Sequence, residues 1–239
     1  MWLEHFDAIF VINLPARADR RREMDQQLQR LGLSLQHEKV VLFPAVRPDS
    51  PGGFPSIGAR GCFMSHLGVL QMAQAKGVDN ILILEDDCDF SKNVTAMLSQ
   101  LDDGLQKMDW AIVYGGALND FESQPGATGL QTVLPDTGLM GSHCIALRGS
   151  VVSMVAMYFE AMLRRPPGSP EGGPMHVDGA YSWFRKDHPE LTTLIFVPEL
   201  AFQRSSATDV HARRWYDYAP VVRNVVGVLR FLKNKWSGA

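Results

Sequence analysis

The chain has 239 residues, of which 46% are hydrophobic and 21% charged, and its formal net charge is -3. This composition predicts a folded domain with a sizeable core and excludes a disordered protein. A nucleic-acid-binding protein is also excluded, because such proteins usually carry a strongly basic surface. The three widely separated cysteines favour a reducing compartment over a disulfide framework. Since no secretion signal or membrane-length apolar run is recognisable, we expect a cytoplasmic protein.

The predicted elements alternate between strands and helices along the chain. Residues 8–12 form a buried-strand run, after which Asp19 is expected to cap a helix that stops at Gly32. Further strands are expected at residues 37–43, 81–84, 110–114, 141–147 and 192–197, and the strand at 192–197 is expected to be the last. Helices are expected at residues 61–76, 150–164 and 177–187. Long loops are expected at residues 47–60, 117–139 and 165–174. This alternation predicts an α/β fold of the Rossmann type, with a mixed, mostly parallel sheet flanked by helices.

The segment ILILEDDCD at residues 81–89 carries most of the functional signal. Four apolar residues predict a strand buried on both faces, and four acids follow within five positions. Neighbouring carboxylates repel by about 4 kcal/mol at an effective dielectric of 20, so a cation is expected among them. Mn²⁺ and Mg²⁺ prefer carboxylate oxygen, and ligands of open α/β sheets bind beyond the carboxyl ends of strands. The alternative is a solvated acidic turn in which Asp89 or Ser91 caps the next helix.

Six short segments, in this order, resemble the motifs of glycosyltransferase family 25. They are IFVINL at 9–14 with DRR at 19–21, GARGCFMSH at 58–66, ILEDD at 83–87, GSHCIAL at 141–147, HVD at 176–178 and VPELAFQRSS at 197–206. The family includes bacterial lipopolysaccharide and lipooligosaccharide β-galactosyltransferases and animal procollagen galactosyltransferases. Two positions depart from its pattern: Ala59 stands where the family usually has Glu, and Cys144 with its neighbours replaces the usual Gly-Tyr.

The resemblance implies a GT-A-like fold, a nucleotide-sugar donor with UDP-galactose as the first candidate, and inversion at the anomeric carbon. It also implies Mn²⁺ or Mg²⁺ at the acidic motif, where the ion offsets charge on the departing diphosphate. Asp87 is the first candidate metal ligand, followed by Glu85 and Asp89. Alternation along an extended segment places these three on one side and Asp86 on the other, where it can bind the ribose or the sugar. His211 is a further candidate ligand, with simple exposure as the alternative.

Asp178 is the candidate catalytic base, carried over from the matching Val-Asp pair. An inverting transfer needs a base that removes the proton of the attacking acceptor hydroxyl. The alternative is structural, because Asp is favoured at helix N-termini as a cap.

The remaining candidates are assigned to the donor. Asn13, at the end of the first strand, is expected near the base or ribose, and Arg17 and Arg20, at the basic start of the next helix, near the phosphates. Ser65 and His66 of the second motif are expected near the pyrophosphate. Gln203 of the closing motif is also assigned to the donor. A buried structural His and a solvated helix start are the competing interpretations.

Residues 216–239 are expected to form a basic amphipathic helix that follows a catalytic domain at residues 1–215. Apolar residues recur at helical spacing, and basic residues lie between them without an acid: Val222, Val225, Val226, Leu229 and Leu232, with Arg223, Arg230, Lys233 and Lys235. Such a helix can lie on the inner face of the cytoplasmic membrane, near a glycolipid acceptor, or pack on the domain.

Three functional hypotheses remain open at this stage. The first is a metal-dependent hexosyltransferase that acts on a glycan or glycolipid in lipopolysaccharide or glycan synthesis. The second is a non-catalytic carbohydrate-binding or assembly module, which the Ala59 departure allows. The third is a phosphohydrolase of the haloacid dehalogenase type, which also places Asp-x-Asp after a buried strand, here at Asp87 and Asp89.

Overall fold

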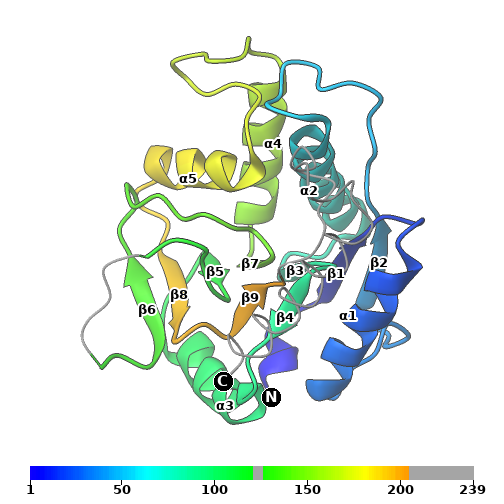
Figure 1. Cartoon of the computed structure of the whole chain (residues 1–239). Helices are drawn as coiled ribbons and strands as arrows, with labels where there is room; N and C mark the ends of the chain where they lie inside the picture. Colours follow the sequence, from blue (N-terminus) through cyan, green and yellow to red (C-terminus); the bar gives the residue numbers. More distant parts are fainter. Residues whose placement is uncertain (121–125, 205–239) are drawn as a thin grey trace.

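The computed structural model describes residues 1–120 and 126–204. A seven-stranded sheet lies at its centre, with helices on both faces (Figure 1). His211 and the predicted helix at residues 216–239 lie outside the described residues. Among the helices that are described, none has both the length and the apolar character needed to cross a membrane.

The sheet has the strand order β2-β1-β3-β7-β5-β8-β6, and two further strands, β4 and β9, pair separately. The strands are β1 Ala8–Asn13, β2 Val40–Pro44, β3 Ile81–Glu85, β4 Cys88–Phe90, β5 Ile112–Tyr114, β6 Gly129–Val133, β7 Cys144–Leu147, β8 Thr193–Val197 and β9 Ala201–Gln203. Strand β1 is parallel to β2 and β3, and β5 is parallel to β8, whereas β7 and β6 run antiparallel to their neighbours. The prediction of a mixed, mostly parallel α/β sheet is therefore confirmed.

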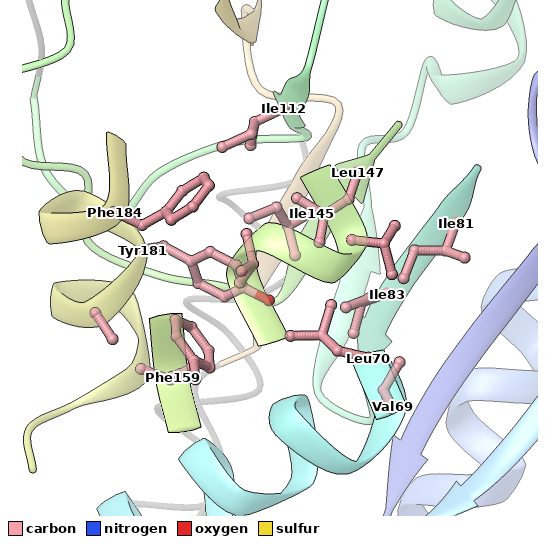
Figure 2. Close-up of a cluster of buried hydrophobic side chains, with 14 of the residues drawn as sticks. Val69, Leu70, Ile81, Ile83, Ile112, Ile145, Leu147, Phe159, Tyr181 and Phe184 are labelled. Carbon is pink, nitrogen blue, oxygen red and sulfur yellow. The ribbon is translucent and has the colours of Figure 1, made fainter. Parts of the chain in front are cut away.

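Two hydrophobic cores cover the two faces of the sheet. The helices are η1 Trp2–His5, α1 Ala18–Arg30, α2 Ile57–Lys76, α3 Val94–Lys107, α4 Val151–Leu163 and α5 Val177–Asp187. Along β1, Phe10 packs with α2, α4 and α5, whereas its neighbours Ile9 and Val11 pack with η1, α1 and α3. Figure 2 shows the first core, in which Phe159, Tyr181 and Phe184 from the helices meet the isoleucines of the sheet. Since both faces are covered, the inner strands β1, β3, β5 and β7 read as nearly continuous apolar runs.

Several predicted boundaries need correction. The α1 N-cap is Arg17 rather than Asp19, and α3 begins after Asn93 rather than after Asp89 or Ser91. The expected loop at residues 117–139 contains strand β6, and β9 follows the strand predicted to be the last. Strand β4 incorporates Asp89 into regular structure, so the acidic segment is not simply a solvated turn.

The strand pairing brings the acidic segment into contact with distant parts of the chain. Ile12 of β1 pairs with Glu85 at the end of β3. Because β7 runs antiparallel to β3, its first residues also lie at this end of the sheet, and the Glu85 amide donates to the carbonyl of His143 at 3.0 Å. The short sheet formed by β4 and β9 then places Gln203 opposite Cys88. The acidic segment is thereby surrounded by residues from three regions of the sequence.

Candidate functional site

Two cavities meet at the acidic segment. The large cavity has a volume of about 820 Å³, and the small cavity has a volume of about 300 Å³. Glu85, Asp87 and Cys62 line both of them, whereas Asp86 lines only the small one. Residues 86 and 87 form a turn between β3 and β4, so the alternation predicted for an extended segment over residues 85–89 does not describe this site. A carboxylate pair thus separates two spaces of different size.

Glu85 is held by donors from two other elements. Its Oε1 atom accepts hydrogen bonds from Ser142 at 2.6 Å, from Nε2 of His66 at 3.2 Å and from the Cys62 thiol at 3.8 Å. Burial raises the pKa of Glu85, but the hydrogen bond and charge of His66, with the Ser142 hydroxyl, lower it to about 2. Within the described residues all three bonds end on Oε1, so Glu85 keeps a negative charge and its second oxygen for a ligand.

His66 supports Glu85 from behind. Its side chain is fully buried, and its Nδ1 atom lies 3.2 Å from the hydroxyl of Tyr181 on α5. Nε2 therefore faces Glu85 and Nδ1 faces Tyr181. His66 lines neither cavity. This geometry suits a positioning role for His66, and its assignment to the donor stays a prediction.

Asp86 is satisfied on the β1 side of the site. Its two oxygens accept hydrogen bonds from Asn13 at 2.7 Å and from Arg20 at 2.8 Å. All three residues are buried. Asn13 and Arg20 therefore both donate hydrogen bonds to the Asp86 carboxylate. Arg20 and Asp86 also line the small cavity.

Asp87 is the least compensated charge of the segment. Its Oδ2 atom lies 3.3 Å from the Gln203 amide and 3.4 Å from Arg20, and its buried Oδ1 atom has no hydrogen-bond partner among residues 1–120 and 126–204. Burial, and then the negative charge of Glu85, raise the pKa of Asp87 to about 7 against the opposing charge of Arg20. A buried acceptor without a hydrogen-bond donor destabilises the folded state, and a bound cation would remove this cost.

Asp89 faces a different environment. Its carboxylate accepts the Arg204 guanidinium at 3.0 and 3.1 Å, and Arg204 also pairs with Glu23 of α1. Asp89 lines neither cavity. Its assignment as a metal ligand stays a prediction, and in this structure Arg204 neutralises its charge.

Asp178 lies in the wall of the large cavity, at the second residue of α5. Its Oδ1 atom accepts the Gly179 amide at 2.8 Å, and its Oδ2 atom accepts the Gly141 amide at 3.1 Å. The first bond is typical of an acid at a helix start, whereas the second ties α5 to the segment before β7. The carboxylate is thus fixed in the same cavity as Glu85 and Asp87.

The other predicted donor residues are dispersed. Ser65 donates to the carbonyl of Gly61 at 2.7 Å, accepts the Val46 amide at 2.8 Å, and lines the small cavity. Arg17 pairs with Asp19 at 2.7 Å and lines neither cavity. Gln203 lines the large cavity beside Asp87, as its place in the closing motif suggests.

Sequence reasoning missed three residues of the site. Cys62 is four positions before His66 on one helix, a spacing that places both on the same face. Ser142 lies in the matched segment at 141–147, which could have identified it. Trp183 has no such signal, because only the packing of α5 brings it into the wall of the large cavity.

Cys62, His66 and Glu85 form a second set of possible metal ligands, with one atom from each within 4.8 Å of the others. Burial, followed by the charge of Glu85, raises the pKa of the Cys62 thiol well above its usual value. Metal binding needs the thiolate, so this effect disfavours Cys62 as a ligand. The carboxylates of Glu85 and Asp87 remain the better donors.

Comparisons with known proteins agree with the sequence pattern. The family model of glycosyltransferase family 25 (LPS biosynthesis protein) matches residues 6–146, which is more than half of the chain. A relative from Rattus norvegicus, "Probable inactive glycosyltransferase 25 family member 3", is 30% identical over 129 residues, which cover 46% of this chain and 23% of the relative. "Procollagen galactosyltransferase 1-B" of Xenopus laevis is 28% identical over 131 residues, covering 46% of this chain and 21% of its own length. The chain thus matches less than a quarter of these relatives.

Among solved structures, a glycosyltransferase involved in the glycosylation of the major capsid of PBCV-1 is similar to this chain. It shares 10% identity at a TM-score of 0.40, covering 80% of this chain and 93% of its own.

Proposed function

Because this chain belongs to glycosyltransferase family 25, we propose that it is an inverting transferase that moves a hexose from a UDP-sugar to a saccharide acceptor. Galactose is the first candidate hexose, since relatives bear the name procollagen galactosyltransferase. Lipopolysaccharide or another glycan is the proposed product class. The observation that carries the proposal is the position of Glu85 and Asp87 at the junction of two cavities.

We assign the small cavity to the nucleotide. It lies at the carboxyl ends of β1 and β3, where ligands of α/β sheets bind. Its wall combines the apolar side chains Ile12, Val46 and Ile57 with Arg20, a combination suited to a base and to phosphate charge. Asp86 lies in the same wall as an acceptor for ribose hydroxyls.

The carboxylates fit a divalent cation. The unpartnered Oδ1 of Asp87 and the second oxygen of Glu85 would hold it, because hard cations take carboxylate oxygens. When bound, Mn²⁺ or Mg²⁺ supplies positive charge that stabilises the departing diphosphate. Gln203 and Arg20 orient Asp87, and His66 with Ser142 keeps Glu85 ionised.

We assign the large cavity to the transferred sugar and the acceptor. The acceptor hydroxyl gives its proton to Asp178 as its oxygen bonds to the anomeric carbon, and the bond from that carbon to the UDP oxygen breaks. Attack opposite the leaving group inverts the anomeric configuration. The Gly141 and Gly179 amides orient the Asp178 carboxylate for this step.

A non-catalytic saccharide-binding module is the second candidate. The relatives from rat, mouse and human are named as inactive or probably inactive members of the family. Ala59, which lines the large cavity, removes one carboxylate of the family pattern. The family match leaves no support for the phosphohydrolase hypothesis.

The test is product formation with a panel of UDP-hexoses and simple glycosides, with and without Mn²⁺. The proposal expects Mn²⁺-dependent consumption of one UDP-hexose, and at least a hundredfold loss in Asp87→Asn. Asp103→Asn, an exposed Asp to Asn change on α3, is the matched control and keeps activity. Donor binding without turnover on any acceptor would favour the module instead.

We further propose a cytoplasmic protein that contacts the inner face of the membrane through residues 216–239. The basic and apolar residues of that segment support this proposal. Co-sedimentation of the full chain with anionic vesicles is expected, and deletion of residues 216–239 is expected to abolish it. Failure of the full chain to bind such vesicles would end this part of the proposal.

A further inference from the structure

The large cavity is lined by both charged and apolar side chains. Glu85, Asp87 and Asp178 line it together with Trp183, Leu118 and Met140. Leu118 and Met140 are 52% and 55% exposed. The chemistry proposed above uses the carboxylates and gives no role to the apolar side chains.

The segments that carry Leu118 and Met140 are bonded to each other. The Leu118 amide donates to the carbonyl of Met140 at 2.9 Å, and Asn119 accepts the Met140 amide at 2.7 Å and donates to Gly138 at 3.0 Å. These bonds join two segments that are about twenty residues apart. They place the backbone of both segments in the wall of the large cavity.

Trp183 is supported on one side by the loop that precedes α5. A Cβ atom added to Gly172 would lie 3.2 Å from Cε3 of Trp183, so the backbone of this loop packs closely against the indole. Gly172 has a φ of +80°, a conformation that favours glycine. Arg165 donates to the carbonyls of Glu171 and Gly172, which holds the loop in position. The indole is half-buried and also lines the large cavity.

Trp183 and the candidate base belong to the same helix and line the same cavity. Asp178, Gly179, Ser182 and Trp183 of α5 all line the large cavity. Trp183 is five residues after Asp178, which corresponds to about 7.5 Å along the helix axis and about 140° around it. Gly179, one turn before Trp183, adds no side chain to the cavity wall.

We propose that Trp183 is the platform on which a pyranose ring of the acceptor stacks, so that the acceptor is a saccharide rather than a peptide hydroxyl. This inference rests on the function proposed above and assigns the contact with its acceptor ring to Trp183. The C–H face of a pyranose is apolar and packs on a flat indole, while its hydroxyls remain free to bond to polar side chains of the same cavity. A linear peptide side chain offers no ring for such a contact.

The experiment compares Trp183→Ala and Trp183→Phe with the wild-type chain. Transfer to pyranosides and to a hydroxylysine-containing peptide is measured, together with hydrolysis of the donor by water. The proposal expects a pyranoside acceptor, with at least a tenfold higher acceptor KM in Trp183→Ala and less than a threefold change in Trp183→Phe. Donor hydrolysis and donor KM stay within twofold in both variants. Leu134→Ala, an exposed apolar truncation outside both cavities, is the control.

Saturation-transfer NMR on the wild-type chain and Trp183→Leu tests the contact without requiring turnover, even if Trp183→Ala does not fold. Aromatic-to-pyranose transfer that weakens in Trp183→Leu supports the platform. An unchanged acceptor KM in Trp183→Ala, undiminished transfer in Trp183→Leu, or activity on the peptide alone overturns it. If only the Trp183 proposal fails, the wild-type chain still binds and hydrolyses the donor. If the wild-type chain shows neither donor binding nor donor hydrolysis, the transferase proposal itself fails.

Discussion

The Nε2 atom of His66 lies 3.2 Å from Oε1 of Glu85, at the end of the strand that carries the acidic segment. His66 is fully buried and contacts Tyr181 through its other ring nitrogen. The pair therefore connects α2, β3 and α5 at the point where the two cavities meet. The contact with His66 lowers the pKa of Glu85. Because this contact exists only in the folded protein, folding keeps Glu85 negatively charged.

Replacing His66 with Ala is expected to weaken both stability and cation binding. A buried carboxylate that loses its partner destabilises a fold by about 3–5 kcal/mol, although Ser142 and Cys62 still donate to Glu85 here. We expect a loss of about 3 kcal/mol in urea unfolding and at least a tenfold weaker Mn²⁺ affinity by calorimetry. Gln71→Ala, on the outer part of the same helix, is the control. Wild-type Mn²⁺ affinity in the His66 variant would contradict the positioning role.

Asp178→Asn is expected to separate catalysis from donor binding. The amide keeps the size of the carboxylate but cannot accept the acceptor proton, so kcat should fall at least a hundredfold. Affinity for the UDP-sugar should stay within threefold, because we assign the donor nucleotide to the small cavity. Asp187→Asn, at the other end of α5, is the matched control. A kcat within threefold of the wild type would remove Asp178 as the base.

Arg20→Met is expected to destabilise the β1 side of the site. Arg20 lies 2.8 Å from Asp86 and 3.4 Å from Asp87, and its removal leaves two buried carboxylates without their cation. Breaking such a buried pair costs about 3–5 kcal/mol. Thermal unfolding of the ligand-free protein should show this loss, and Mn²⁺ should restore part of it. Arg22→Met, a substitution of an exposed arginine on the same helix, is the control. Equal stability of the two variants would refute the prediction.

Acid sensitivity is expected to depend on His143. This residue is buried, its Nε2 atom donates to the carbonyl of Ala201 at 3.1 Å, and burial lowers its pKa below 6.5. The folded state then binds fewer protons than the unfolded state below pH 6.5, so stability falls as the pH decreases. Between pH 6.5 and 5.5 the wild type should lose more stability than His143→Asn in urea unfolding. Parallel curves for the two proteins would show that His143 does not titrate in this way.

The sequence predicted the elements that have a strong periodic pattern. The apolar runs of β1 and β3 and the amphipathic α4 and α5 lie close to their expected positions. Strand β6 was missed because GLQTV has little hydrophobic alternation and lies in a polar stretch, and β9 is only three residues long. Short strands of this kind depend on their partners, β8 and β4, more than on their own propensity.

The candidate site was predictable in its charges but not in its contacts. The acid cluster at the end of β3 could be read directly from residues 85–89. The bond between His66 and Tyr181 spans 115 residues, and that between Asp87 and Gln203 spans 116, so local patterns could not predict either. The position of Trp183 depends in the same way on how α5 packs against the core. Tertiary packing therefore supplied the supporting residues of the site.

The most direct test is a crystal of the chain grown or soaked with Mn²⁺ and UDP, measured for the anomalous signal of manganese. We predict one peak within bonding distance of carboxylate oxygens of both Glu85 and Asp87, with the uridine in the small cavity. A fully occupied UDP whose diphosphate lies away from these residues, with no manganese peak beside them, would contradict a cation site at Glu85 and Asp87.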